Sequence, residues 1–170
     1  MKKKVDAPPT RYIKKTIDAL SQTGLLLVSG NSNKANVMTI GWGLMGILWA
    51  RPFFIVAVRP TRYTYQLIEE TGEFTINVPT KNMNAIVSYC GTVSGRDHDK
   101  FKEKQLTLLP GKNVKSPVIA ECVIHYECKV AFKTQFAPPP LSNKEKTRLY
   151  PTGDYHKLYY GEIVASYANK

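Results

Sequence analysis

Residues 120–136 form the segment that most constrains the fold, because apolar and polar side chains largely alternate along it. One set is apolar apart from Thr134: Ala120, Cys122, Ile124, Tyr126, Cys128, Val130, Phe132 and Phe136. The other set includes Glu121, His125, Glu127, Lys129, Lys133 and Gln135. This period predicts a strand with one buried and one solvated face, ended by the prolines of residues 138–140. Because it exceeds the usual strand length of about 3–10 residues, we expect it to bend or to reach a second subunit.

Residues 36–78 predict a strand, a buried strand, a basic turn, a helix and a further strand in succession. Small and polar residues interrupt the first strand, 36–43, and leave its backbone open to a flat ligand. The six apolar residues 53–58 are typical of a strand buried on both faces. Residues 59–64 begin a helix with Thr61 as the expected N-cap, and the free amides of a helix start favour a phosphate.

The chain before this region predicts a short helix and a hairpin. Ile13, Ile17 and Leu20 fall at helical spacing, and Gly24 is the expected end of that helix. Residues 25–29 then form the first barrel strand, which turns back into the strand that begins at Asn36. Together these elements are expected to start the barrel.

Residues 44–51 are apolar but contain Gly46 and are followed by a proline, which predicts an irregular connection. In this interpretation Trp49 is a core aromatic residue and not a ligand contact. For Trp42 the core and the ligand-binding interpretations both stay open. The two tryptophans are therefore expected to differ in role.

The remaining elements follow from glycine positions and short patterns. Gly72 is expected to end the helix of the basic turn, and residues 83–90 predict another short helix. Residues 137–154 form a polar, proline-bearing excursion, and a loop of this length is usually functional or mobile. Residues 156–167 close the barrel as a last strand with Gly161 as a bulge.

The 170 residues suit one domain, which we place at residues 16–170 behind an arm of residues 1–15. Lys and Arg outnumber Asp and Glu by 24 to 13, and the net charge of +11 favours anionic partners. Apart from residues 2–4, the basic residues are dispersed along the chain. This favours a phosphorylated small ligand and argues against a nucleic-acid partner.

Cysteine spacing and the N-terminus indicate the compartment. Cys90, Cys122 and Cys128 have no CxxC spacing, so the sequence predicts neither a disulfide framework nor a metal site. A charged, proline-bearing segment follows the initial lysines where a signal peptide would be apolar. No uncharged apolar run approaches the ~20 residues of a membrane span. We therefore expect a cytoplasmic protein with buried thiols and no membrane partner.

Four short motifs occur in a specific order, at residues 36–42, 59–64, 72–79 and 94–101. Together they resemble the flavin reductase-like family, which includes flavoredoxins and ferric reductases. The resemblance implies a mainly β fold, an FMN-binding split β-barrel of Greek-key type with a few short helices. It also implies noncovalently bound FMN and a homodimer with each site near the subunit interface.

The resemblance and the basic turn together assign most of the cofactor site. The phosphate anchor is expected at Arg59, Thr61, Arg62 and Thr64, because guanidinium groups suit a phosphate dianion. A solvated turn capped by a threonine is the alternative. The strand that runs along the flavin ring is expected to contribute Asn36, Thr39, Ile40, Gly41 and Trp42. A simple turn role for the asparagine stays open.

Residues 94–100 match the family loop that approaches the flavin ring and phosphate, and they contribute Ser94, Gly95 and Lys100. A lysine near the N1 and O2 edge of the ring would stabilise the reduced, anionic flavin. Lys100 is therefore a candidate catalytic residue. The alternative is that this charged loop is simply exposed to solvent.

His156 is the second candidate catalytic residue, because it resembles the family histidine that lies close to the flavin. Tyr155 interrupts the usual Gly-Asp-His element, although the spacing from His156 to Gly161 is kept. This departure puts a direct role in doubt. Tyr167, near the end of the same strand, is a further candidate contact of the ring.

The resemblance implies electron transfer through FMN by an NADH- or NADPH-dependent flavin or ferric reductase. A flavoredoxin-like carrier without its own nicotinamide turnover is the alternative, and a basic nucleic-acid-binding barrel is a third hypothesis. The sequence has no Walker loop, no HExxH and no GxGxxG motif. The electron acceptor, a small molecule or a protein, is left open.

Overall fold

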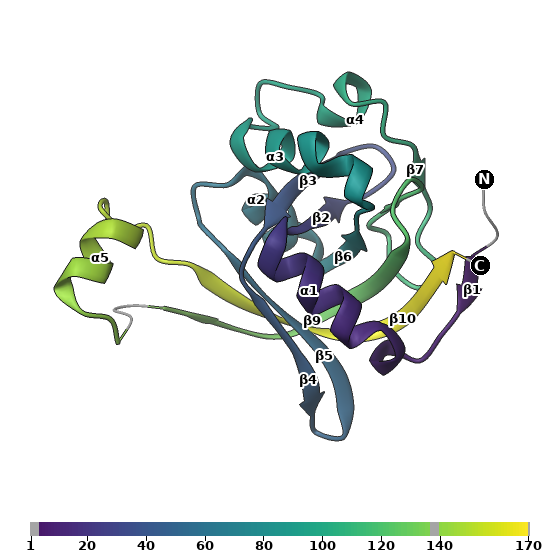
Figure 1. The fold of residues 1–170 in the computed structure, drawn as a ribbon, viewed down its shortest axis with the longest axis horizontal. Coiled ribbons are helices and arrows are strands. Elements are labelled where there is room, and N and C mark those ends of the chain that lie inside the picture. The colour runs from purple at the N-terminus through teal and green to yellow at the C-terminus, as the bar shows by residue number, and fades with distance from the viewer. Residues whose placement is uncertain (1–3, 137–139, 170) are drawn as a thin grey trace.

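The computed structural model describes residues 4–136 and 140–169 and is built on one antiparallel sheet (Figure 1). Its strands follow the order β3-β2-β6-β9-β10-β5-β4, and β1 pairs with β10. Their bounds are β1 Lys4–Asp6, β2 Leu25–Gly30, β3 Ala35–Ile40, β4 Gly43–Leu48, β5 Arg51–Val58, β6 Glu73–Val78, β9 Ile124–Gln135 and β10 Lys157–Asn169. A separate two-stranded sheet joins β7 Leu108–Leu109 to β8 Val118–Ile119. This is the mainly β architecture that the sequence predicts.

Helices cover the sheet or project from it. They are α1 Ile13–Gln22, α2 Tyr63–Thr71, α3 Asn84–Thr92, α4 Lys100–Glu103 and α5 Asn143–Leu149, with 3-10 turns η1 Pro9–Tyr12 and η2 Lys81–Met83. α2 packs against β2 and β3, and α3 packs against β3. In contrast, α5 lies at the far end of the β9–β10 ribbon, away from the barrel (Figure 1). Among the described residues, no helix is long and apolar enough to cross a membrane.

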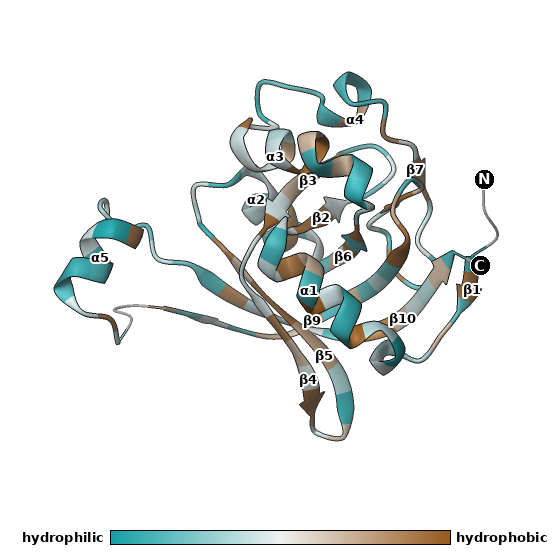
Figure 2. Ribbon diagram, in the orientation of Figure 1, coloured by the Kyte–Doolittle hydropathy of each residue, from teal (hydrophilic) through white to brown (hydrophobic). Residues whose placement is uncertain are grey.

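The core has two parts that share β2, because successive side chains of a strand point to opposite faces. Leu25 and Leu27 belong to the larger cluster inside the barrel. Leu26 and Val28 belong to a second cluster between the sheet and α3. Figure 2 shows apolar residues along these central strands and polar residues on the outer surfaces of the helices. A strand buried on both faces explains why β2 is apolar almost throughout.

Several predicted elements are confirmed. The helix before the barrel is present, and residues 25–30 pair with residues 35–40 as the expected hairpin. Gly72 ends α2 in the left-handed conformation at φ 65°. The register of β10 against β9 shifts at Gly161, which is the predicted bulge.

The irregular connection predicted at residues 44–51 is wrong, because this segment forms β4 and pairs with β5. Trp49 and Ala50 make the tight turn with φ of 51° and 58°, a conformation that non-glycine residues seldom adopt. Trp49 is also 61% exposed and is therefore not the expected core residue. It lies at the tip of the hairpin, where its ring contacts Phe53 edge to face.

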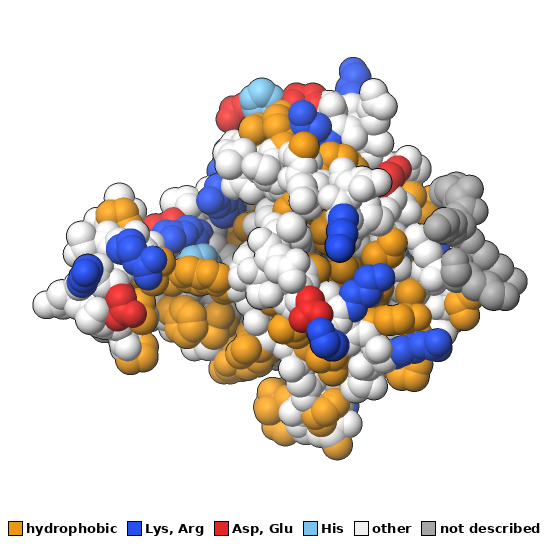
Figure 3. Space-filling model, in the orientation of Figure 1, with side chains coloured by type: hydrophobic (Ala, Val, Ile, Leu, Met, Phe, Trp, Pro, Cys, Tyr) orange, Lys and Arg blue, Asp and Glu red, His pale blue; other side chains and the backbone are white. Residues whose placement is uncertain are grey.

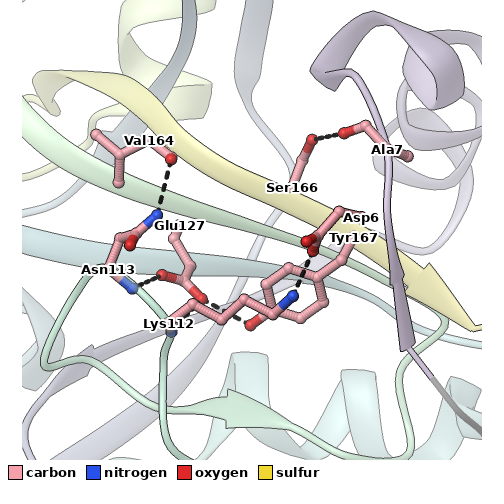
Figure 4. A network of polar contacts seen from close by, with 8 residues as sticks. All are labelled: Asp6, Ala7, Lys112, Asn113, Glu127, Val164, Ser166 and Tyr167. Carbon is pink, nitrogen blue, oxygen red and sulfur yellow. Dashed lines mark hydrogen bonds and ion pairs between the residues drawn. The ribbon is translucent and has the colours of Figure 1, made fainter.

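The prediction of a solvated face for residues 120–136 is wrong for the first part of this segment. β9 begins at Ile124, and the side chains of His125 and Glu127 are fully buried. Glu127 accepts hydrogen bonds from the backbone amides of Lys112 (2.7 Å) and Asn113 (2.6 Å), and from the Tyr167 hydroxyl (Figure 4). The loop that contains Lys112 and Asn113 covers this face, so the polar side chains are buried but paired. Of the expected terminator, only Pro140 is among the described residues, and residues 137–139 lie outside them.

The expected N-terminal arm, of which residues 1–3 lie outside the described residues, continues the sheet instead. Lys4–Asp6 pair with the last residues of β10, from Tyr167 to Asn169. Asp6 forms an ion pair with Lys112, and Ser166 donates to the carbonyl of Ala7 (Figure 4). The expected boundary after residue 15 falls inside α1.

Candidate functional site

Two adjoining cavities lie beside β3. The first, here called the α2 cavity, has a volume of about 270 Å³ between β3, the start of α2 and the segment after α3. The second, the Trp42 cavity, has a volume of about 160 Å³ at the end of β3. Met38 and Arg62 line both cavities, so the two lie directly beside each other.

Polar side chains and a close backbone approach build the α2 cavity. Asn36 and Thr64 are buried, and the Asn36 amide donates to the Thr64 hydroxyl over 2.8 Å. A Cβ atom on Gly95 would lie 2.0 Å from Asn36 Oδ1, so only glycine lets this loop come so near. Ser94 and Gly95 line the same wall. The structure thus brings Asn36, Thr64, Ser94 and Gly95 together, as the sequence predicts.

The start of α2 opens into this cavity without a side-chain cap. Arg62 is its N-cap residue, and no side chain accepts a hydrogen bond from the first turn. Amides at an uncapped helix start remain available to an anion, and the helix dipole favours negative charge there. Because the Arg62 side chain lines the cavity as well, the α2 cavity is suited to a phosphate.

Two members of the predicted phosphate anchor have a different role. The Arg59 guanidinium donates to the backbone carbonyls of Leu149 (2.7 Å) and Asp154 (3.2 Å). Thr61 is not the N-cap, and its hydroxyl donates to Asp154 Oδ2 over 2.7 Å. Both side chains therefore hold the segment that follows α5. Arg59 still lines the Trp42 cavity, and Thr61 still lines the α2 cavity.

Lys100 lies on the buried floor of the α2 cavity and not in an exposed loop. Its ammonium group donates to the carbonyls of Val37 and Cys90, each over 2.9 Å. Burial is the main cause that lowers the pKa of Lys100, the nearby Cys90 thiol opposes this, and the Arg62 charge adds to it. Lys100 does not line the Trp42 cavity, so its role in tuning a ring there stays a prediction.

The Trp42 cavity is lined in part by aromatic side chains. It is lined by the consecutive residues Thr39, Ile40, Gly41 and Trp42. The Trp42 ring lies 4.6 Å from the ring of His156, measured between centroids. Four of the five residues predicted along the ring therefore line this cavity, whereas Asn36 lines the α2 cavity.

His156 completes the wall of the Trp42 cavity and is held by Tyr150. The Tyr150 hydroxyl and His156 Nδ1 are 2.8 Å apart. Burial, followed by the Arg59 and Arg62 charges and opposed by Asp154, lowers the pKa of His156 to about 4. The imidazole is therefore neutral at pH 7.

Tyr167 does not belong to this site. It is separated from His156 by almost the whole of β10, which rises ~3.3 Å per residue. Its hydroxyl donates to Glu127 and its ring lies against that of His125. Burial and then the Glu127 carboxylate raise its pKa. The predicted ring contact is replaced by a structural role.

Sequence reasoning missed several residues that line the cavities or support them. Among them are Met38, Tyr63, Arg96 and Tyr150. Met38 shares a strand face with Asn36, so its position was available from the period of β3. Arg96 donates to the Thr61 carbonyl over 3.0 Å. It lies in the motif at residues 94–101. Nothing in the sequence pattern pointed to Tyr150.

This fold and these two cavities define a small barrel with a site suited to a flat ligand that carries a phosphate. A family model described as flavin reductase like domain matches residues 19–170. The chain belongs to the flavin reductase-like family. Within the described residues, no group of His, Cys, Asp or Glu could hold a metal ion.

Curated relatives span most of the chain. An uncharacterised protein of Archaeoglobus fulgidus is 37% identical over 139 residues, which cover 82% of this chain and 68% of the relative. An uncharacterised protein of Pyrococcus abyssi is 35% identical over 143 residues, with 82% and 70% covered. These similarities support the family and not a particular reaction.

Solved structures of similar fold include two flavoredoxins. The protein from Methanosarcina acetivorans is 29% identical with a TM-score of 0.69, covering 87% of this chain and 69% of that one. Flavoredoxin of Desulfovibrio vulgaris (Miyazaki F) is 26% identical with a TM-score of 0.69, covering 100% and 78%. These neighbours carry the split-barrel fold that the sequence predicts.

Proposed function

We propose that this protein binds FMN noncovalently and transfers electrons through it. The observation that carries the proposal is that the α2 cavity and the Trp42 cavity share Met38 and Arg62. One ligand with a phosphate at one end and a flat ring at the other would occupy both. The family and the flavoredoxin neighbours support FMN as that ligand.

The residues present fit this cofactor. Arg62, the first amides of α2 and the Thr64 side chain would hold the phosphate. Trp42 and His156 would face the ring, and the run from Thr39 to Gly41 would border its edge. Bound FMN would supply the redox chemistry, so the protein has to orient the ring, set its surroundings and leave a face open.

We further propose that NADH or NADPH is the electron donor and that free flavin, ferric iron or a protein is the acceptor. A flavoredoxin-like carrier without its own nicotinamide turnover is the second candidate, supported by the two flavoredoxin neighbours. The cytoplasmic location and the absence of nucleic-acid and membrane partners remain predictions from the sequence.

A homodimer is part of the proposal, because apolar side chains gather over the β4–β5 hairpin (Figure 3). Leu44, Ile47 and Trp49 are 64%, 63% and 61% exposed, and Phe132 and Phe136 are also exposed. Large exposed apolar residues in one region favour a protein interface. A twofold partner would bury them.

The visible spectrum of the purified protein and a fluorescence titration with FMN test the proposal. We expect a yellow protein, or quenching of FMN fluorescence that saturates at one FMN per chain. No binding of either FMN or riboflavin would overturn the proposed function. Anaerobic mixing with NADH and with NADPH then separates the two candidates, because an enzyme is bleached rapidly and a carrier is not.

A further inference from the structure

We propose that Tyr150 is a positioning residue that holds His156 in its Nε2–H tautomer at the wall of the Trp42 cavity. The inference gives a function to the excursion between β9 and β10, which carries Tyr150. It rests on the proposed function only for the identity of the ligand that this imidazole would meet.

The contact between the two side chains carries the argument. Tyr150 is buried, and its hydroxyl oxygen lies 2.8 Å from His156 Nδ1. Burial raises the pKa of the Tyr150 phenol, so the hydroxyl keeps its proton at neutral pH. An unprotonated imidazole nitrogen is a good acceptor for that proton. A neutral phenol can donate to an unprotonated Nδ1 or accept from an Nδ1–H group; in the proposed arrangement Tyr150 donates, and the single N–H of the neutral ring is on Nε2.

Burial, and then the charge around the pair, keep the histidine neutral. Arg59 and Arg62 oppose a further positive charge on the imidazole, and Asp154 only partly offsets them. The Arg59 guanidinium also lies over the Tyr150 ring, 4.9 Å from its centroid. A nearby cation makes a phenol a stronger hydrogen-bond donor. Both effects favour a neutral histidine that accepts at Nδ1.

Contacts on several sides fix the position of Tyr150. Arg59 holds the carbonyl of Leu149, the residue before it, and the carbonyl of Asp154 further on. The Tyr150 ring also meets Tyr155 at 5.0 Å and Trp42 at 6.2 Å between centroids. A positioning residue needs this support, because a loosely held partner cannot fix the orientation of a ring.

The tautomer determines what the Trp42 cavity can recognise. An Nε2–H group is a donor, so the cavity would favour an acceptor atom on its ligand, such as a carbonyl oxygen or an unprotonated ring nitrogen. The opposite tautomer would offer an acceptor and would favour a donor. Tyr150 thus sets a preference in the cavity without itself appearing among the residues that line it.

Long-range proton–nitrogen NMR of the histidine side chains tests the proposal directly. In the protein as isolated and without added FMN, His156 should be almost entirely in the Nε2–H form at pH 7. Tyr150→Phe keeps the ring and removes the hydroxyl, so we expect a mixture of the two tautomers. FMN affinity should fall roughly two- to tenfold, the effect of one neutral hydrogen bond.

The matched control is Tyr155→Phe, which removes the neighbouring phenol hydroxyl and leaves Tyr150 and His156 in contact. Its His156 spectrum should match that of the wild type. An Nδ1–H tautomer in the wild type, or an unchanged spectrum in Tyr150→Phe, would overturn the proposal. The wild-type spectrum alone shows which tautomer His156 adopts, even if the Tyr150→Phe variant does not fold. FMN binding by the wild type with the wrong tautomer would leave the proposed function intact.

Discussion

Arg59 donates a hydrogen bond from Nη2 to the backbone carbonyl of Leu149 over 2.7 Å, across 90 positions of sequence. This bond gives Arg59 a different role from Arg62, although both arginines lie in the same short turn. Arg59 is directed to the excursion that carries α5, whereas Arg62 lines both cavities. The two basic side chains should therefore respond differently to substitution.

We expect Arg62→Ala to weaken FMN binding by roughly 1.5–3 kcal/mol, the range for a hydrogen bond to a charged group. Riboflavin has no phosphate and should bind almost as well as before. Arg59→Ala should weaken both ligands to a similar extent, because it loosens the wall of the Trp42 cavity. Fluorescence titrations with both ligands measure these differences.

Arg51→Ala is the matched control for charge, because this arginine of the β4–β5 hairpin pairs with Glu162 of β10 and lines neither cavity. It should leave both affinities unchanged. Equal losses of FMN and riboflavin binding in Arg62→Ala would show that the phosphate anchor is elsewhere.

Gly95→Ala should reduce FMN affinity, because the new Cβ would lie 2.0 Å from Asn36 Oδ1. The loop or the asparagine has to move, and the contact between Asn36 and Thr64 is the nearest one at risk. We expect a loss of at least about tenfold, equal to ~1.4 kcal/mol. Gly46→Ala is the control, since nothing lies within 4 Å of a Cβ there. Equal affinity of the two variants would contradict this account of the wall.

Lys100→Met should lower the free energy of unfolding by roughly 1–3 kcal/mol, because two buried carbonyls lose their donor. These are the carbonyls of Val37 and Cys90. Urea denaturation without added flavin measures the change. Lys102→Met, on the exposed side of the same short helix, should have little effect. Similar stabilities of the two variants would show that the bonds of Lys100 are dispensable.

Ile47→Lys should convert a dimer into a monomer, because it places a charge among the exposed apolar side chains of the β4–β5 hairpin. Sedimentation velocity of the wild type and the variant measures this. Ser21→Lys adds the same charge at an exposed position of α1 and should leave the dimer intact. A monomeric wild type that retains FMN would remove the interface from the proposal.

Acid should destabilise the protein partly through His125. Burial is the main cause that lowers the pKa of His125 to about 3, and the Lys4 charge adds to it. The unfolded chain takes up a proton below pH 6.5, whereas the folded protein does so only near pH 3. The free energy of unfolding therefore falls as the pH decreases from 6.5 toward 3, by up to ~1.4 kcal/mol per pH unit.

His125→Gln should reduce the slope of the unfolding free energy against pH by an amount that corresponds to about one proton. Equilibrium unfolding at several values between pH 6.5 and 4.5 gives the slope. Lys4, Asn77 and Tyr167 face the ring and remain in the variant. His98→Gln, at an exposed position, should keep the wild-type slope. Identical slopes for all three proteins would mean that His125 can be protonated in the fold.

The strand periods, the glycine signals and the four motifs predicted most of the barrel correctly. The β4–β5 hairpin was missed because its turn uses Trp49 and Ala50 in a conformation that usually signals glycine or asparagine. The buried face of β9 was missed because periodicity describes one strand and not what covers it. The amides of Lys112 and Asn113, which pair with Glu127, lie outside any pattern in that strand.

A pattern within one segment likewise does not show which distant residues contact the site. Residues close in sequence, from Asn36 to Trp42, could be assigned together because β3 and the two residues after it carry them. The separate roles of Arg59 and Thr61 depend on Leu149 and Asp154, which reach the turn only after the chain has folded. Short motifs therefore predicted which residues lie near one another and did not predict the partners of their side chains.

The pairing of Lys4 with Asn169 links the first described strand to the last one. During synthesis the ribosome releases β1 long before β10, so β1 has no partner until almost the whole domain has emerged. Domains generally fold as units in this situation, and a contact of such sequence separation forms late. Lys4–Asp6 therefore stay without a strand partner until Tyr167–Asn169 have emerged from the ribosome.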